Sequence, residues 1–197
     1  MVKRIFDLVS ALIGILLLSP LLLFICLWIK FDSSGPIFFI QKRVGLKGKT
    51  IGVYKFRTMV VDAESKGLKI TVGNDPRITN SGHFLRKYKL DELAQLFNVL
   101  NGSMSLVGPR PEVQEYIDVY PNDIRKKVLS VRPGITDFAS IEFKDENQML
   151  TKSTNPNKTY IEEILPIKQQ YYIQYVNEQS LLLDIKLIVR TIVAIVQ

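Results

Sequence analysis

The residues best suited to chemistry are two adjacent carboxylates, Asp91 and Glu92, which follow a basic stretch that contains Arg86 and Lys89. Behind them, apolar residues recur at the i, i+3, i+4, i+7 spacing of one buried helix face. These apolar residues are Leu93, Leu96, Phe97 and Leu100. The spacing predicts that the carboxylates lie in the first turn of a helix, where the helix dipole favours anions. Carboxylates and fixed cations at a helix start suit a phosphate group together with a divalent metal.

The same pair also has a purely structural interpretation. Acidic side chains in a first helical turn are common electrostatic caps that need no ligand. The choice between a cap and a catalytic pair therefore depends on the remainder of the chain.

Other segments carry cations in settings that suit phosphate. Lys55 and Arg57 are two residues apart in a predicted strand, so they project from one face. Arg110 lies between two prolines that fix the backbone, and Arg132 precedes another proline in a loop. A guanidinium held at low entropic cost suits bidentate contact with phosphate. A solvated strand edge for the first pair, and a rigid turn with an incidental arginine for the others, are the alternative interpretations.

Composition points to one domain that associates with a membrane or with anions. The 197 residues carry a net charge of +7, which suits nucleic acid, anionic lipid or phosphorylated substrates. The mean hydropathy is +0.12, unusually high for a soluble basic protein. A single cysteine, Cys26, excludes an internal disulfide and a cysteine-rich metal site.

The uncharged run of residues 8–29 is long enough to cross a bilayer core of about 30 Å. Ser19-Pro20 lies at its centre, where proline kinks a helix and serine can satisfy a carbonyl that the kink frees. Lys3 and Arg4 precede the run and Lys30 follows it, so both ends carry charge that prefers the cytoplasm. A re-entrant hairpin broken at Ser19 and Pro20 and a straight transmembrane helix both stay open on these grounds.

The remaining chain predicts an α/β domain that is mostly helical with one short β-hairpin. Strands are predicted at 37–41, 51–57 and 104–107, with a hairpin loop at 45–49. Helices are predicted at 112–119, 122–129 and 160–175, and residues 60–67 suit an exposed turn or short helix. Residues 181–196 are apolar with inserted charges, which suits packing on the core or lying on the membrane surface.

Taken together, the motifs resemble those of the monotopic polyprenyl-phosphate phosphoglycosyl transferases, bacterial sugar transferases that start lipid-linked glycan synthesis. The matching segments, in chain order after the Ser19-Pro20 break, are Lys55–Met59, Asp75–Thr79, Leu90–Leu93, Val107–Pro111 and Arg132–Thr136. The resemblance covers nearly the whole chain and suggests the small members that consist of the catalytic core. One departure is Ala94, where many relatives have proline, at a helix position expected to lie away from the chemistry.

The resemblance implies a membrane hairpin over residues 1–30 and a catalytic domain over 31–197 with interfacial amphipathic helices, on the cytoplasmic face of the bacterial inner membrane. It implies transfer of a phosphosugar from a UDP-sugar to undecaprenyl phosphate, with UMP as the by-product. Asp91 would be the nucleophile, and Asp91 and Glu92 would hold Mg²⁺, with Mn²⁺ as the alternative. Arg86 would bind phosphate, assisted by Lys55, Arg57, Arg110 and Arg132. Downstream membrane glycosyltransferases are expected partners, and nucleic acid is not.

General chemistry agrees with that mechanism. A carboxylate that attacks phosphorus splits one difficult step into two, and cations screen the repulsion between the two anions. Mg²⁺ needs only one or two carboxylates plus substrate oxygens. A basic membrane-tethered protein that binds lipid or nucleic acid without turnover, and a membrane scaffold, stay as alternatives, although neither explains an Asp-Glu pair beside fixed arginines.

Overall fold

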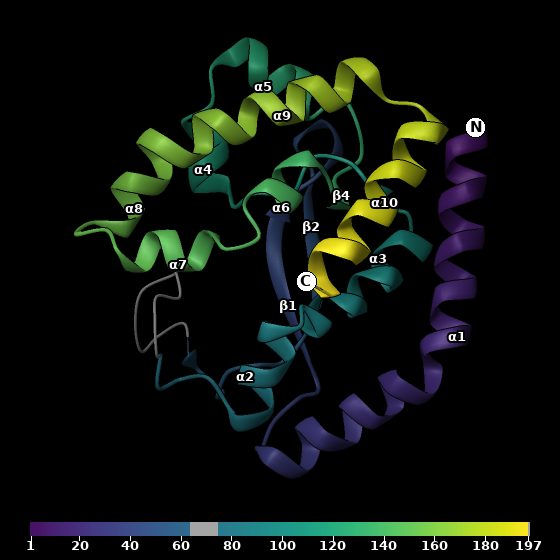
Figure 1. The fold of residues 1–197 in the computed structure, drawn as a ribbon, viewed down its shortest axis with the longest axis vertical. Coiled ribbons are helices and arrows are strands. Elements are labelled where there is room, and N and C mark those ends of the chain that lie inside the picture. Colours follow the sequence, from purple (N-terminus) through teal and green to yellow (C-terminus); the bar gives the residue numbers. More distant parts are fainter. Residues whose placement is uncertain (64–74, 197) are drawn as a thin grey trace.

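The computed structural model describes residues 1–63 and 75–196, and Figure 1 shows their arrangement. The turn or short helix predicted over residues 60–67 lies partly outside these residues. The helices are α1 (Val2–Asp32), α2 (Asn80–Lys87), α3 (Leu96–Leu100), α4 (Gln114–Asp118), α5 (Asn122–Val128), α6 (Phe138–Glu142), α7 (Glu146–Thr151), α8 (Pro156–Thr159), α9 (Leu165–Glu178) and α10 (Leu181–Val196). The tighter or wider turns are η1 (Leu46–Gly48), η3 (Leu90–Gln95) and η4 (Tyr160–Ile164). The predicted mostly helical architecture is thus confirmed.

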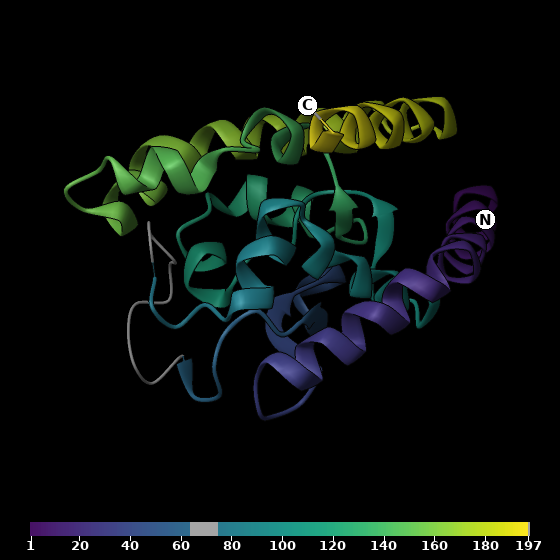
Figure 2. The ribbon, with the colours of Figure 1, turned by 60° about the horizontal axis from the view of Figure 1, so that its bottom comes forward.

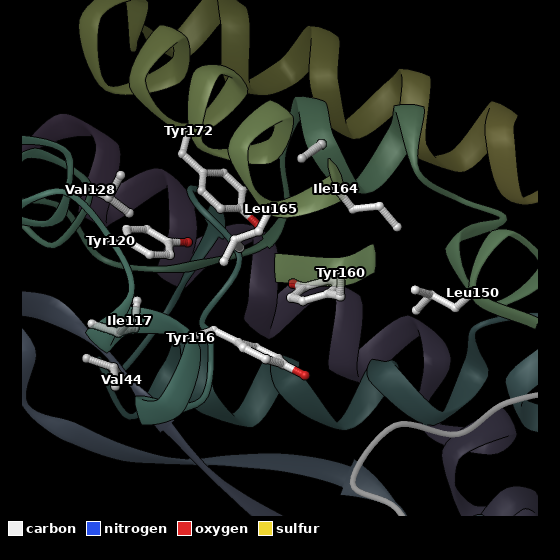
Figure 3. Packing of buried hydrophobic residues seen from close by; sticks show 11 residues of the cluster. Val44, Tyr116, Ile117, Tyr120, Val128, Leu150, Tyr160, Ile164, Leu165 and Tyr172 are labelled. Carbon is white, nitrogen blue, oxygen red and sulfur yellow. The ribbon is translucent and has the colours of Figure 1, made fainter. Parts of the chain in front are cut away.

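The strands form two small sheets. β1 (Phe38–Val44) and β2 (Thr50–Phe56) make the predicted antiparallel hairpin, in which Val44 pairs with Thr50 and Phe38 with Phe56. β3 (Ser105–Val107) and β4 (Gly134–Thr136) pair in parallel. A large buried cluster lies between α4, α5 and α9, and Figure 3 shows its tyrosines stacked with aliphatic side chains.

Two glycines let the β3–β4 pair form. A Cβ atom on Gly134 would lie 2.1 Å from the Gly108 nitrogen, so both backbones can approach only without side chains. The Gly108 N–H donates to the Thr136 carbonyl at 3.0 Å, and the Gly134 N–H donates to the Pro109 carbonyl at 3.0 Å. Through these contacts, segments 107–111 and 132–136, whose arginines are predicted to bind phosphate, lie against each other.

A third glycine brings two other predicted segments together. A Cβ atom on Gly82 would lie 2.1 Å from the Thr58 carbonyl oxygen, so α2 rests directly on the chain beyond β2. That carbonyl accepts the Thr79 N–H at 3.0 Å, and the Thr79 hydroxyl caps α2 by accepting the Gly82 N–H. Segments 55–59 and 75–79 are therefore packed as one unit.

α1 is one helix with Pro20 inside it, and Figures 1 and 2 show that its axis bends in the middle. In a regular helix, residue 20 would donate to the Leu16 carbonyl, but proline has no N–H. The Ser19 hydroxyl donates to that carbonyl instead, at 2.8 Å. The expected role of Ser19 at the kink is confirmed, and the break takes the form of a bend rather than two separate helices.

Both ends of α1 attach to the same domain. At the start, Lys3 pairs with Asp184 of α10 at 2.6 Å, and Arg4 donates to the Val99 carbonyl at 2.7 Å. At the end, the Asp32 carboxylate accepts the Ser81 N–H of α2 at 2.9 Å. Between these contacts α1 has the length and composition to cross a membrane, and many of its apolar side chains are exposed. The kinked helix consequently lies along the body of the domain.

Candidate active site

Asp91 and Glu92 lie in the first turn of η3, as predicted. Lys89 has a left-handed backbone with φ of 55°, which ends α2 and turns the chain into η3. The prediction of a continuous apolar helix face is wrong, because η3 is a six-residue 3₁₀ turn that only then passes into α3. Phe97 is 38% exposed, whereas the polar Asn98 is buried and bonds Gly52 and Tyr54 of β2. A polar anchor therefore fixes the carboxylate pair to the hairpin.

Asp91 is only 7% exposed. Within residues 1–63 and 75–196, no hydrogen bond to its carboxylate is made. Burial raises the pKa of Asp91, and the neighbouring Glu92 charge acts in the same direction against the cations Lys55, Arg86 and Lys89. A buried carboxylate with nearby cations and no hydrogen bond from the described residues is available to react.

Glu92 has the opposite environment. Its carboxylate accepts two hydrogen bonds from the Arg110 guanidinium, one of them at 3.1 Å, and a third from the Lys55 ammonium at 3.1 Å. Burial opposes ionisation of Glu92, but Arg110 and Lys55 outweigh burial and hold its pKa well below the usual range. Glu92 thus joins β2, η3 and the loop after β3 in one ionic cluster.

Asp137, which the sequence analysis did not identify, holds Arg110 in place. Asp137 is fully buried and accepts the Arg110 backbone N–H at 3.0 Å as well as the Ser140 N–H, as the N-cap of α6. The signal available in the sequence is aspartate in front of a short helix, a preferred N-cap pattern. Nothing in the neighbouring sequence indicates that its second oxygen holds the loop that carries Arg110.

Glu112 is a second residue that the sequence analysis did not identify, and it follows the segment that contains Arg110. It is buried and accepts from the hydroxyls of Tyr160, at 2.8 Å, and Tyr172, at 3.3 Å. Figure 3 shows the side chains of Tyr160 and Tyr172 within the buried cluster. These bonds fix the end of the proline-arginine segment to the helical half of the domain.

Arg86 also lies in the site region. It is half-buried, and its Nε donates to the Thr58 hydroxyl at 2.9 Å. Burial lowers its pKa, while the negative charge of Asp91, followed by that of Asp75, raises it. Asp75 is itself bound by Arg77 at 2.5 Å, and this side-chain contact lowers the pKa of Asp75 to about 2. Arg86 is therefore a cation whose field acts on Asp91.

Two predicted phosphate-binding arginines have other partners. Arg57 is buried and donates to the carbonyls of Ser33, Ser34 and Pro36, so it holds the turn between α1 and β1. β2 ends at Phe56, and the rule that places residues i and i+2 on one strand face does not extend to Arg57. Arg132 is exposed and donates to the Gly102 carbonyl at 2.9 Å. The structure brings Lys55, Arg86 and Arg110 to the carboxylate pair but gives Arg57 and Arg132 structural contacts.

Asp91 and Glu92 supply donor atoms of the kind that a divalent metal prefers. The residues described here contain no cluster of three or more His, Cys, Asp or Glu side chains that would enclose an ion. Asp91 accepts no hydrogen bond from the part of the chain that the structure describes, whereas the Glu92 oxygens accept from Lys55 and Arg110. Mg²⁺ commonly takes one or two carboxylates and completes its shell with phosphate oxygens and water. The assignment of both Asp91 and Glu92 as ligands stays a prediction.

Comparison with known proteins places the chain in a family. The chain is 38% identical over 195 residues to the UDP-glucose:undecaprenyl-phosphate glucose-1-phosphate transferase of Escherichia coli (strain K12), covering 98% of this chain and 39% of that protein. It is 36% identical over 193 residues to the UDP-N-acetylgalactosamine-undecaprenyl-phosphate N-acetylgalactosaminephosphotransferase of Aeromonas hydrophila, covering 97% and 43%. It is 45% identical over 147 residues to the exopolysaccharide production protein PSS of Rhizobium leguminosarum bv. phaseoli, covering 71% and 72%.

The chain spans about two fifths of the length of the first two relatives. Its match to the family described as bacterial sugar transferase extends over residues 1–197. The chain therefore belongs to the bacterial sugar transferase family.

Proposed function

We propose that the chain transfers a phosphosugar from a nucleoside diphosphate sugar, a UDP-sugar, to a polyprenyl phosphate such as undecaprenyl phosphate. The observation that carries this proposal is the buried Asp91 carboxylate, to which no described residue donates a hydrogen bond, beside the Lys55–Glu92–Arg110 cluster. The names of the Escherichia coli and Aeromonas hydrophila relatives describe the same class of reaction. The product starts a lipid-linked glycan, which downstream membrane glycosyltransferases would extend.

In the first step, an Asp91 oxygen attacks the phosphorus that bears the sugar. The bond from that phosphorus to the bridging oxygen breaks, and UMP leaves with both bonding electrons. Asp91 then carries the phosphosugar as a mixed carboxylic-phosphoric anhydride. The weak solvation of Asp91 favours this step, because a buried carboxylate gives up little hydration when it approaches the substrate.

The cations allow one anion to approach another. Lys55 and Arg110 are held together by Glu92, whose negative charge offsets their mutual repulsion. Arg86 adds a third positive charge near Asp91. These donors suit the oxygens of the diphosphate, where negative charge builds up in the transition state. Asp91 and Glu92 would hold Mg²⁺, or Mn²⁺ as the alternative, and the ion would supply further neutralisation of the diphosphate charge.

In the second step, a phosphate oxygen of the polyprenyl phosphate attacks the phosphorus bound to Asp91. The bond from phosphorus to the Asp91 oxygen breaks, which restores the free carboxylate and releases the polyprenyl diphosphate sugar. Each step replaces one phosphorus–oxygen bond by another, so no redox partner is needed.

We further propose that α1 enters one leaflet and returns, on the cytoplasmic face of the bacterial inner membrane. Support comes from the contacts of both ends with one domain, through Lys3 and Asp32, and from the bend at Pro20. The exposed apolar face of α10, which includes Leu182 and Ile192, adds a second surface for the membrane interface. This arrangement places the site beside the phosphate of a lipid-embedded acceptor.

Replacing Asp91 by Asn keeps the size of the side chain but removes the nucleophile. UMP release from UDP-sugars with undecaprenyl phosphate should fall by about a thousandfold or more. Asp123→Asn changes an exposed carboxylate of α5 and should keep the parent rate. Near-normal UMP release by Asp91→Asn, at unchanged thermal unfolding, would rule out the covalent role.

Removal of divalent metal should stop the parent enzyme, because the diphosphate charge would lose its main neutralisation. UMP release is measured in excess chelator and again after Mg²⁺ or Mn²⁺ is restored. Recovery with either ion is the expected result. Full activity in excess chelator would show that the cations of the protein suffice and that the metal assignment is wrong.

Topology is testable with a cysteine at Val2 in a chain whose Cys26 is replaced by Ala. A membrane-impermeant thiol reagent should leave this cysteine unlabelled in intact cells and label it after permeabilisation. A cysteine at Lys126, on the exposed face of α5, is the matched control and should behave identically. Labelling of Val2→Cys in intact cells, while Lys126→Cys is protected, would instead identify a spanning helix.

A further inference from the structure

A line of aromatic rings runs from the second half of α1 to the end of α2. Phe24 lies 5.8 Å from Trp28, Trp28 lies 5.4 Å from Phe84, and Phe84 lies 4.7 Å from Tyr88, between ring centroids. Figure 1 shows α2 above this half of α1, so the two helices bring the rings together. We call these four residues the aromatic line.

The aromatic line is exposed where a soluble protein would bury it. Phe24 is 59% exposed, Phe84 45% and Tyr88 40%, and the partly buried Trp28 joins them. Contiguous exposed apolar surface usually marks a binding site. Here it begins on a helix that is apolar enough for a membrane.

The other end of the aromatic line is cationic. The Lys87 ammonium lies 5.3 Å from the centre of the Tyr88 ring. Lys89 follows directly, and its charge, like that of Arg86, acts on the Asp91 carboxyl. An apolar path thus ends in positive charge next to the proposed nucleophile.

From this order we propose that the aromatic line binds the isoprenoid chain of the polyprenyl phosphate acceptor and directs its phosphate to Asp91. The inference rests on the proposed function and adds the surface that recognises the lipid. An acceptor of this kind has one long unsaturated apolar chain and one anionic head, which match the rings and the cations respectively. Methyl and alkene groups pack well against aromatic faces. The head would lie near Lys89, and successive isoprene units would meet Tyr88, Phe84, Trp28 and Phe24 in that order.

Direct binding can be read without turnover, because Trp28 is the only tryptophan of the chain. Undecaprenyl phosphate, undecaprenol and phosphatidylglycerol are titrated into the protein in the same detergent micelles. Undecaprenyl phosphate should give a saturable change in Trp28 emission at a lower concentration than undecaprenol, which lacks the anionic head, and phosphatidylglycerol should give none. The double variant Phe84→Ala/Tyr88→Ala should weaken its Kd about tenfold, equivalent to about 1.4 kcal/mol. Phe31→Ala, an exposed ring of α1 outside the line, should keep the parent Kd.

Steady-state kinetics test whether the effect of each ring depends on the length of the isoprenoid chain of the acceptor. Phe24→Ala should raise the KM for undecaprenyl phosphate several-fold and leave the KM for a two-isoprene phosphate unchanged, since a short chain ends before Phe24. Tyr88→Ala should raise both, and neither change should move the KM for the UDP-sugar by more than about twofold. Equal effects of Phe24→Ala on long and short acceptors would overturn the proposed order of contacts.

Other outcomes separate this inference from the proposed function. The same saturable signal with phosphatidylglycerol would mean that the aromatic line only contacts membrane lipid. Equal affinity for undecaprenol would mean that the cations do not hold the phosphate, and either result would overturn the inference. An unchanged Kd in the double variant would overturn it as well. UMP release from the UDP-sugar in the presence of undecaprenyl phosphate tests the proposed function in the parent protein. Its absence would refute that function, while the Trp28 titration would still decide whether the aromatic line binds polyprenyl phosphate.

Discussion

The site depends on the ionic cluster in which Glu92 binds Lys55 and Arg110 at once. Three segments far apart in the sequence meet in it: β2, η3 and the loop after β3. Two cations would repel each other at such close range, and the carboxylate between them removes that cost. Because Asp137 fixes the Arg110 backbone and Asn98 fixes η3 to β2, the cluster is supported from both sides. Loss of Glu92 would therefore displace Lys55 and Arg110 and would also change the surroundings of Asp91.

The contrast between two neighbouring carboxylates is the chemical consequence. The pKa of Glu92 is lowered by Arg110 and Lys55, whereas burial raises the pKa of Asp91. Pairs of titratable groups whose environments separate their pKa values commonly divide the roles at an active site. Here Glu92 organises positive charge, and Asp91 is left without a hydrogen bond from the described residues. The division suits one residue that reacts and one that arranges the field.

The sequence predicted those parts of the site that local rules determine. The position of Asp91 in a first helical turn, the Ser19 bond at the Pro20 kink and the β1–β2 hairpin all depend on nearby residues, and the structure confirms them. The sequence predicts phosphate contacts for Arg57 and Arg132, because a cation beside a fixed backbone has the same sequence pattern whether its partner is a ligand or a carbonyl. Only the tertiary fold shows that their partners are carbonyls. The Asp137 contact was hidden for the same reason.

The central claim is that Asp91 carries the phosphosugar between two half-reactions. The most direct measurement is the intact mass of the protein after incubation with a UDP-sugar and metal in the absence of polyprenyl phosphate, followed by peptide mapping. The account predicts one added phosphosugar, located on Asp91, that disappears when undecaprenyl phosphate is supplied. An unmodified protein that nevertheless releases UMP only when the acceptor is present would contradict it, because that result would mean direct transfer without a covalent intermediate.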